Sequence, residues 1–154
     1  MNFALDRLAK ELAITDSAKE RLRLEFGYAC ALRVQHLLEL PEVEQCLLGL
    51  GEFLAGAADR EHLRALAVEA ARLATHHQGS KSIDGCGHAA VSATYAVAKA
   101  IEGKALEAAS YAAYATVYAR GGSAAVAERE SFEPEFEWQL RSLAALASKT
   151  AAHV

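Results

Sequence analysis

Several features that would identify an enzymatic chemistry are missing from this sequence. Its 154 residues hold only three cysteines, and no two of them have the CxxC spacing. An odd, dispersed set of this kind argues against a secreted disulfide framework and fits thiols buried in a reducing cytosol. The motifs GxSxG, GxGxxG and HExxH, the P-loop and the Glu-x-x-His pair of a di-iron site are also absent. We therefore expect a protein that is not an enzyme, with no catalytic residue, cofactor or metal.

The sequence also lacks long apolar runs and an excess of basic residues. No stretch of about 18 uncharged apolar residues exists, and the N-terminus is charged too early for a signal peptide. Sixteen Lys and Arg against twenty Asp and Glu give a net charge of −4. A nucleic-acid binder usually has a basic surface. We expect no membrane span, no nucleic-acid partner and a cytoplasmic location.

Helix breakers are few, while alanine recurs at helical spacing. Alanine is the strongest helix former, and small side chains let helix axes approach closely. One alanine face precedes Gly103 and a second follows it, between Gly87 and Arg120 (Ala89, Ala93, Ala96 and Ala100, then Ala105, Ala108, Ala112, Ala115 and Ala119). No pattern typical of a strand competes. We predict an all-α, single-domain helical bundle or array over residues 1–154, with about six or seven helices and this alanine-rich pair at its centre.

Outside the central pair, the signals for helix starts and ends divide the first half of the chain into four predicted helices. Helices are predicted over residues 3–13, 17–39, 41–56 and 59–78. Ser17 and Glu20 have the spacing of a capping box. Pro41 suits the first position of a helix, and Asp59 suits an N-cap.

Loop signals mark the rest of the chain. The clearest loop is predicted at residues 79–82, and Gly121 with Gly122 should end the central pair. Ser123 is a candidate cap for the last helical region, which Pro134 should kink or restart. The tail after Lys149 is expected to fray.

Arg33 is the most informative charge, because it lies on the apolar side of its predicted helix. The stripe around it consists of Leu22, Phe26, Ala29 and Leu37. A guanidinium there needs a partner, since burying an unpaired charge costs several kcal/mol or more. Glu130, Glu135 and Glu137 are candidate carboxylates. A structural ion pair or a snorkelling arginine is the plain interpretation, and a direct binding role is the alternative.

Aromatic residues offer candidate contact positions. Tyr111, Tyr114 and Tyr118 form a stripe at i, i+3 and i+7. Such a stripe is either the edge of a core or a recognition face, since tyrosine is enriched at interface hot spots. Trp138 is the only tryptophan and lies opposite the apolar side of its helix. Either a neighbouring helix covers it or a partner does.

The histidines permit two further hypotheses. His76, His77 and His88 with Cys86 are types that bind zinc, but their spacing fits no standard zinc signature, and metal binding stays open. Arg72, separated from His77 by four residues, resembles the pair of the RNA-cleaving helical HEPN fold. There histidine would do acid–base work and arginine would steady the phosphate.

Three segments together resemble one family. Residues 23–34 contain the run Cys30-Ala-Leu-Arg33-Val, followed by Glu39-Leu-Pro41. Gly87-His88-Ala89 opens the alanine-rich helix, and residues 137–143 begin Glu-Trp138-Gln139-Leu. These segments resemble the all-helical immunity proteins of bacterial polymorphic toxin systems (immunity family five). The resemblance spans residues 22–146.

The resemblance implies a bacterial, cytoplasmic protein that binds and neutralises a cognate toxin by occlusion, without catalysis. The residues that match the family are Arg33, His88, Trp138 and Gln139, and the tyrosine stripe is a candidate contact face. Two alternatives stay open. One is an RNase using Arg72 and His77. The other is a non-catalytic helical module that forms a homo-oligomer.

Overall fold

A computed structural model describes residues 1–77 and 86–151, and within these residues the fold is all-α. Seven α-helices and three short 3₁₀ turns account for nearly all of this part of the chain. The helices are α1 (Phe3–Glu11), α2 (Glu20–Arg33), α3 (Pro41–Leu54), α4 (Arg60–His76), α5 (Cys86–Ile101), α6 (Ala105–Val126) and α7 (Glu133–Ala151). The turns are η1 (Ser17–Lys19), η2 (Gln35–Leu37) and η3 (Arg129–Phe132). The predicted fold class is confirmed.

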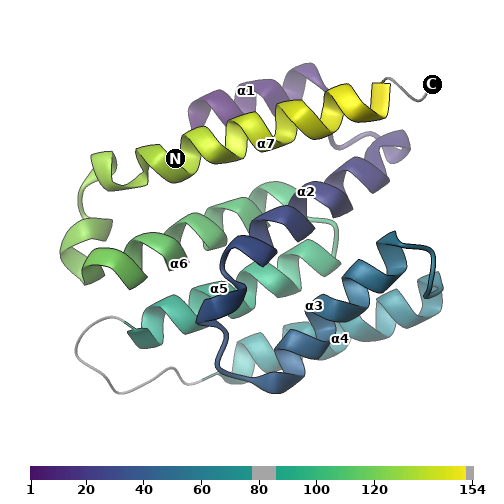
Figure 1. Ribbon diagram of the computed structural model, residues 1–154, viewed down its shortest axis with the longest axis horizontal. Helices are drawn as coiled ribbons and strands as arrows, with labels where there is room; N and C mark the ends of the chain where they lie inside the picture. Colours follow the sequence, from purple (N-terminus) through teal and green to yellow (C-terminus); the bar gives the residue numbers. More distant parts are fainter. Residues whose placement is uncertain (78–85, 152–154) are drawn as a thin grey trace.

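The helices form two layers. In Figure 1, α7, α2 and α3 lie in front, and α1, α6, α5 and α4 lie behind them. Each front helix packs over neighbours in the back layer: α7 contacts α1 and α6, α2 contacts α5 and α6, and α3 contacts α4 and α5. No described helix is long and apolar enough to cross a membrane.

The alanine-rich pair is the centre of the fold, as predicted. Helices α5 and α6 share the most extensive contact among the described elements, and both also pack against α2. Gly103 reverses the chain between them with φ +78°, a left-handed conformation that glycine adopts without a steric penalty. The close approach extends to α2, where a Cβ added to Gly27 would lie 3.1 Å from Ala100 Cα.

Two large apolar clusters fill the space between the layers. One joins α2, α3, α4, α5 and α6 around Leu47 and Leu50, and the other joins α1, α2, α5, α6 and α7 around Phe26 and Leu143. Because α2, α5 and α6 contribute to both, these three helices connect the two ends of the core.

Several predicted helix ends are confirmed. Pro41 occupies the first turn of α3. The Asp59 carboxylate accepts a hydrogen bond from the His62 amide at 2.8 Å and so caps α4. Gly56 follows α3 with φ +82°. The predicted loop at residues 79–82 lies outside the described residues.

Other boundaries were wrong. Helix α2 ends at Arg33, not near Glu39, and η2 follows it, so Leu37 lies in a 3₁₀ turn. The expected capping box of Ser17 and Glu20 is replaced by Asp16, whose carboxylate accepts from the Ala18 amide at the start of η1. Asp16 thus caps the single 3₁₀ turn η1, and α2 begins directly after this turn at Glu20.

The last helical region is divided more than the sequence suggested. The helical backbone breaks at Gly122 (φ 63°, ψ −154°), where the central pair was expected to end, and a further turn continues to Val126. The η3 turn then leads into α7, and Pro134 stands in the first turn of α7. Proline is tolerated there because the first amide groups of a helix have no intrahelical partner. It therefore starts a helix, one of its two predicted effects.

Candidate functional site

Arg33 and Glu135 form a bidentate ion pair between α2 and α7. Arg33 Nε donates to Glu135 Oε2 at 2.6 Å, and Nη2 donates to Oε1 at 2.9 Å. The glutamate side chain is only 3% exposed, whereas the arginine side chain is 36% exposed. The predicted pairing is therefore present, and of the three candidate carboxylates Glu135 is the partner, while Glu130 and Glu137 lie on the surface. The arginine is at the rim of the core, not inside it.

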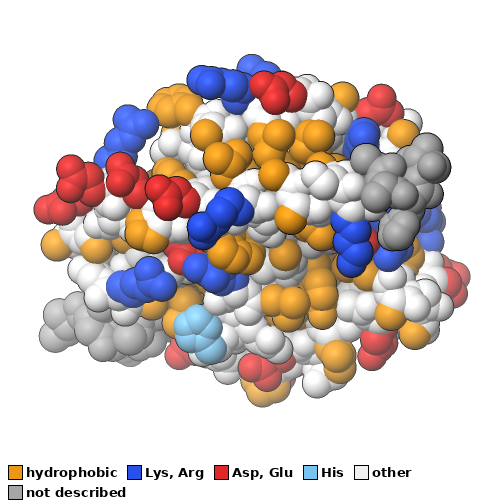
Figure 2. Space-filling view, turned by 45° about the horizontal axis from the view of Figure 1, so that its top comes forward, with side chains coloured by type: hydrophobic (Ala, Val, Ile, Leu, Met, Phe, Trp, Pro, Cys, Tyr) orange, Lys and Arg blue, Asp and Glu red, His pale blue; other side chains and the backbone are white. Residues whose placement is uncertain are grey.

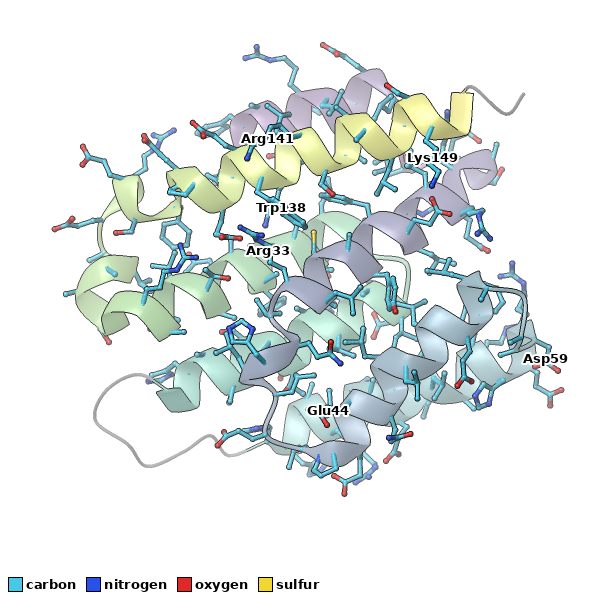
Figure 3. The ribbon with its side chains drawn as sticks, in the orientation of Figure 1. Arg33, Glu44, Asp59, Trp138, Arg141 and Lys149 are labelled. Carbon is cyan, nitrogen blue, oxygen red and sulfur yellow. The ribbon has the colours of Figure 1, made fainter. Side chains whose placement is uncertain are left out.

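Trp138 and Gln139 complete the contacts around this pair. The Arg33 guanidinium lies over the Trp138 ring, 4.4 Å from its centroid, and the two side chains point toward each other in Figure 3. A neighbouring helix thus covers one face of Trp138. Gln139 is buried, and its Nε2 donates to the Ala109 carbonyl of α6 at 2.8 Å. Three of the four family-matching residues therefore fasten α7 to α2 and α6.

Cys30 is buried one turn before Arg33 on α2. Burial raises the pKa of the Cys30 thiol, and the nearby Glu135 carboxylate raises it further. The hydrogen bonds to Glu135 also raise the pKa of Arg33. A protonated, enclosed thiol is a poor nucleophile, so Cys30 acts as part of the packing.

His88 lies apart from this cluster, on the outer face of α5 and α6. Its ring stacks on Tyr118 with centroids 5.2 Å apart, and Tyr95 stacks on Tyr111 at 5.1 Å. Tyr111 and Tyr118 are half-buried, whereas Tyr114 is 43% exposed. The tyrosine stripe is therefore divided, with two members packed on α5 and the middle one facing solvent.

Tyr114 borders an apolar groove between α1, α6 and α7. Its ring meets Phe132 edge-on at 5.1 Å, and Phe132 packs on Phe136 at 5.5 Å. The groove has a volume of about 270 Å³. Leu5 and Leu106 add apolar surface, and the carboxylates of Asp6 and Glu107 also line it.

The residues of the nuclease and metal hypotheses have other partners. Arg72 forks onto Glu69 with bonds of 2.7 and 3.0 Å, and His76 Nδ1 lies 2.8 Å from the Arg72 carbonyl oxygen. His77 is nearly buried, with Nε2 3.8 Å from Glu39 Oε1. Thus Arg72 and His77 face different carboxylates. In residues 1–77 and 88–149 no cluster of three metal-ligating side chains occurs, and the Cys86 side chain lies outside the described residues.

Sequence reasoning missed two contributors to these sites. Asn2 caps α1 through the Leu5 amide, and its Nδ2 donates to the Phe136 carbonyl and to Gln139 Oε1. Asparagine before a helix is a recognisable cap signal, so this role was detectable. Arg120, whose Nη2 lies 3.8 Å from Glu135 Oε1, gave no signal because its partner is close only in the folded chain.

A comparison with known proteins found no family model, curated protein or solved structure that matches this chain. The arrangement of the site itself is therefore the basis for a function. It contains the Arg33–Glu135 ion pair, which joins α2 to α7, and the apolar groove bordered by Tyr114.

Proposed function

We propose that this protein is an immunity protein that binds a cognate bacterial toxin and neutralises it by occlusion. The observation that supports this function is the meeting of two segments that resemble the immunity family. Arg33 of the first segment and Trp138 of the third are stacked at 4.4 Å. Because these side chains are engaged with each other, they hold the helices in place, and the surface for the partner lies elsewhere.

The contact surface is the apolar groove bordered by Tyr114, Phe132 and Phe136. An exposed tyrosine beside a pocket is typical of an interface hot spot, because a large rigid ring is desolvated at little cost in conformational entropy. Among the described residues of α5 and α6, Tyr114 is the large apolar side chain most open to solvent, with 43% exposure.

The occupant is a segment of the toxin with an apolar anchor next to a lysine or arginine. Asp6 and Glu107 line the groove, and the whole molecule has a net charge of −4. In Figure 2, acidic side chains gather at the left end of the molecule. The segment around η3 lies near that end in Figure 1 and carries three exposed glutamates (Glu128, Glu130 and Glu133). A basic partner would be steered toward this end and held more weakly at high salt.

The mechanism needs binding but no chemistry. A stable complex buries on the order of 1,600 Å² in total, which is more than the groove alone provides. The groove therefore anchors the toxin segment, while flanking surface of α1, α6 and α7 covers the toxin's active site. The affinity depends on the few desolvated anchor groups and not on total area.

The test is co-expression with the toxin encoded next to this gene. The wild-type protein should restore growth and co-purify with the toxin. Tyr114→Ala should weaken binding by about tenfold or more, because loss of a hot-spot tyrosine costs about 2 kcal/mol. Binding is measured by titration calorimetry at two salt concentrations.

Leu48→Ala is the matched control, since Leu48 is an exposed apolar residue on α3, away from the groove. It should bind as the wild type does. Absence of both complex and protection would remove the immunity function. Protection that survives Tyr114→Ala unchanged would remove only the groove as the contact surface.

A further inference from the structure

A second pocket lies at the end of α2, beside residues 116–120 of α6 and the start of α7. It has a volume of about 180 Å³ and six lining residues, which come from η2, α2, α6 and α7: Arg33, His36, Thr116, Ala119, Arg120 and Glu135. Arg33, His36 and Arg120 carry N–H donors, and Glu135 carries a carboxylate. The apolar groove proposed above shares no residue with this pocket.

The charge around the pocket is positive although the molecule is acidic. Arg33 and Arg120 contribute two positive charges, and Glu135 removes one. Glu135 is also the inner member, with a 3% exposed side chain, while the Arg120 side chain is 65% exposed. A ligand that enters from solvent therefore meets the arginines first.

Arg33 is held in place with donors to spare. Its fork onto Glu135 uses Nε and Nη2, and Trp138 covers one face of the guanidinium plane. A guanidinium has five N–H groups, so both hydrogens of Nη1 and one of Nη2 remain after this fork. An arginine fixed in this way loses little side-chain entropy when it binds a further acceptor.

The other lining groups complement Arg33. Arg120 is long and exposed, and its 3.8 Å distance to Glu135 is too great for a tight hydrogen bond, so it can turn toward a ligand. His36 is exposed in η2, and a neutral imidazole keeps one N–H donor. The Thr116 hydroxyl donates to the Ala112 carbonyl at 3.1 Å. The donors available to a ligand are therefore the two arginines and the histidine.

We propose that this pocket binds a compact oxyanion, a phosphate or a carboxylate group, between Arg33, Arg120 and His36. Guanidinium groups match the geometry of both oxyanions through paired N–H donors. The oxyanion would bridge α6 at Arg120 to the end of α2, with Glu135 behind Arg33 as the fixed counter-charge. This site is independent of the proposed toxin contact.

The experiment is a titration of the purified full chain with inorganic phosphate, in parallel with acetate, at constant ionic strength maintained with chloride. Arginine side-chain and backbone NMR shifts are followed. We expect saturable shifts at residues 33–36 and 116–120. Arg120→Ala should weaken phosphate binding by about tenfold, since a hydrogen bond to a charged group contributes that much. His36→Ala should weaken it by a smaller factor.

Arg7→Ala is the matched control, because Arg7 is exposed on α1 and outside the pocket. It should leave the titration unchanged. Saturable binding of acetate as well as phosphate assigns the site to carboxylate groups in general, and binding of phosphate alone assigns it to phosphoryl groups. No saturable shift with either anion, or equal affinity in the wild type and Arg120→Ala, would overturn the proposal.

Discussion

Among single residues, Glu135 holds a carboxylate in a position that excludes nearly all water. A carboxylate that is 3% exposed is stabilised only by the groups that face it, and Arg33 supplies two hydrogen bonds. The arginine is less dependent on the pair, because 36% of its side chain is open to water. Removal of Arg33 therefore leaves a buried carboxylate without its main partner, whereas removal of Glu135 leaves an arginine that water can still reach.

Arg33→Ala should destabilise the protein by about 2–3 kcal/mol, because it leaves a buried carboxylate without its main partner. The measurement is urea unfolding followed by far-UV circular dichroism. Arg141→Ala, at an exposed site on α7, the helix of Glu135 (Figure 3), should change stability by less than about 0.5 kcal/mol. Equal losses in the two variants would show that the ion pair contributes little.

Cys30 makes stability depend on alkaline pH. Its pKa is raised in the folded state, so the folded protein keeps the thiol proton to a higher pH than the unfolded chain, whose thiol has a pKa of about 8.5. The stabilisation is complete below that value and declines as pH rises toward the folded-state pKa. The maximum slope from one thiol is about 1.4 kcal/mol per pH unit.

The free energy of unfolding of the wild type should therefore decrease between about pH 8.5 and 10. Cys30→Ala should decrease less steeply over that range, whatever its absolute stability. Denaturant unfolding at several pH values measures both slopes. Parallel slopes in the two proteins would contradict a raised thiol pKa.

Among the elements, α2 and α5 approach each other closely at Gly27, where the nearest atom of the neighbouring helix belongs to its backbone. Gly27 faces the backbone of Ala100, where an added Cβ would lie 3.1 Å from the Cα and 3.2 Å from the Cβ. Both contacts are tighter than ordinary van der Waals packing. Ala100 is fully buried in a central helix and has no room to move away.

Gly27→Ala should therefore destabilise the protein by about 1 kcal/mol or more, although alanine is the better helix former by about the same amount. Steric conflict with a buried backbone outweighs the gain in propensity. Val68→Ala is the control, because Val68 is exposed on α4 and only propensity changes there. Its thermal midpoint should stay level or rise. A rise for Gly27→Ala would show that the α2–α5 spacing can relax.

In the whole molecule, function depends on surfaces that distant segments build together. Arg33 and Glu135 are separated by 102 positions in the chain and are joined by two hydrogen bonds. Residues of α1, α6 and α7 line the apolar groove. Residues of α2, η2, α6 and α7 line the pocket that contains Arg33 and Arg120. Both exist only because α7 lies in the front layer against α2, α6 and α1 (Figure 1).

The sequence by itself determined the class of fold and the order of its helices. Alanine spacing, Pro41, Asp59 and Gly103 act locally, through propensity, caps and a positive φ, so their effects were readable. The need of Arg33 for a carboxylate was readable too, because desolvation penalises any unpaired charge.

Only the tertiary structure decided which carboxylate Arg33 pairs with, that Trp138 is covered by Arg33, and that Tyr114 alone of its stripe faces solvent. It also showed that α2 ends at Arg33 itself. Helical periodicity states which side of a helix is apolar but not which neighbour covers it. That choice depends on how layers of helices pack, and packing joins residues that are far apart in the chain.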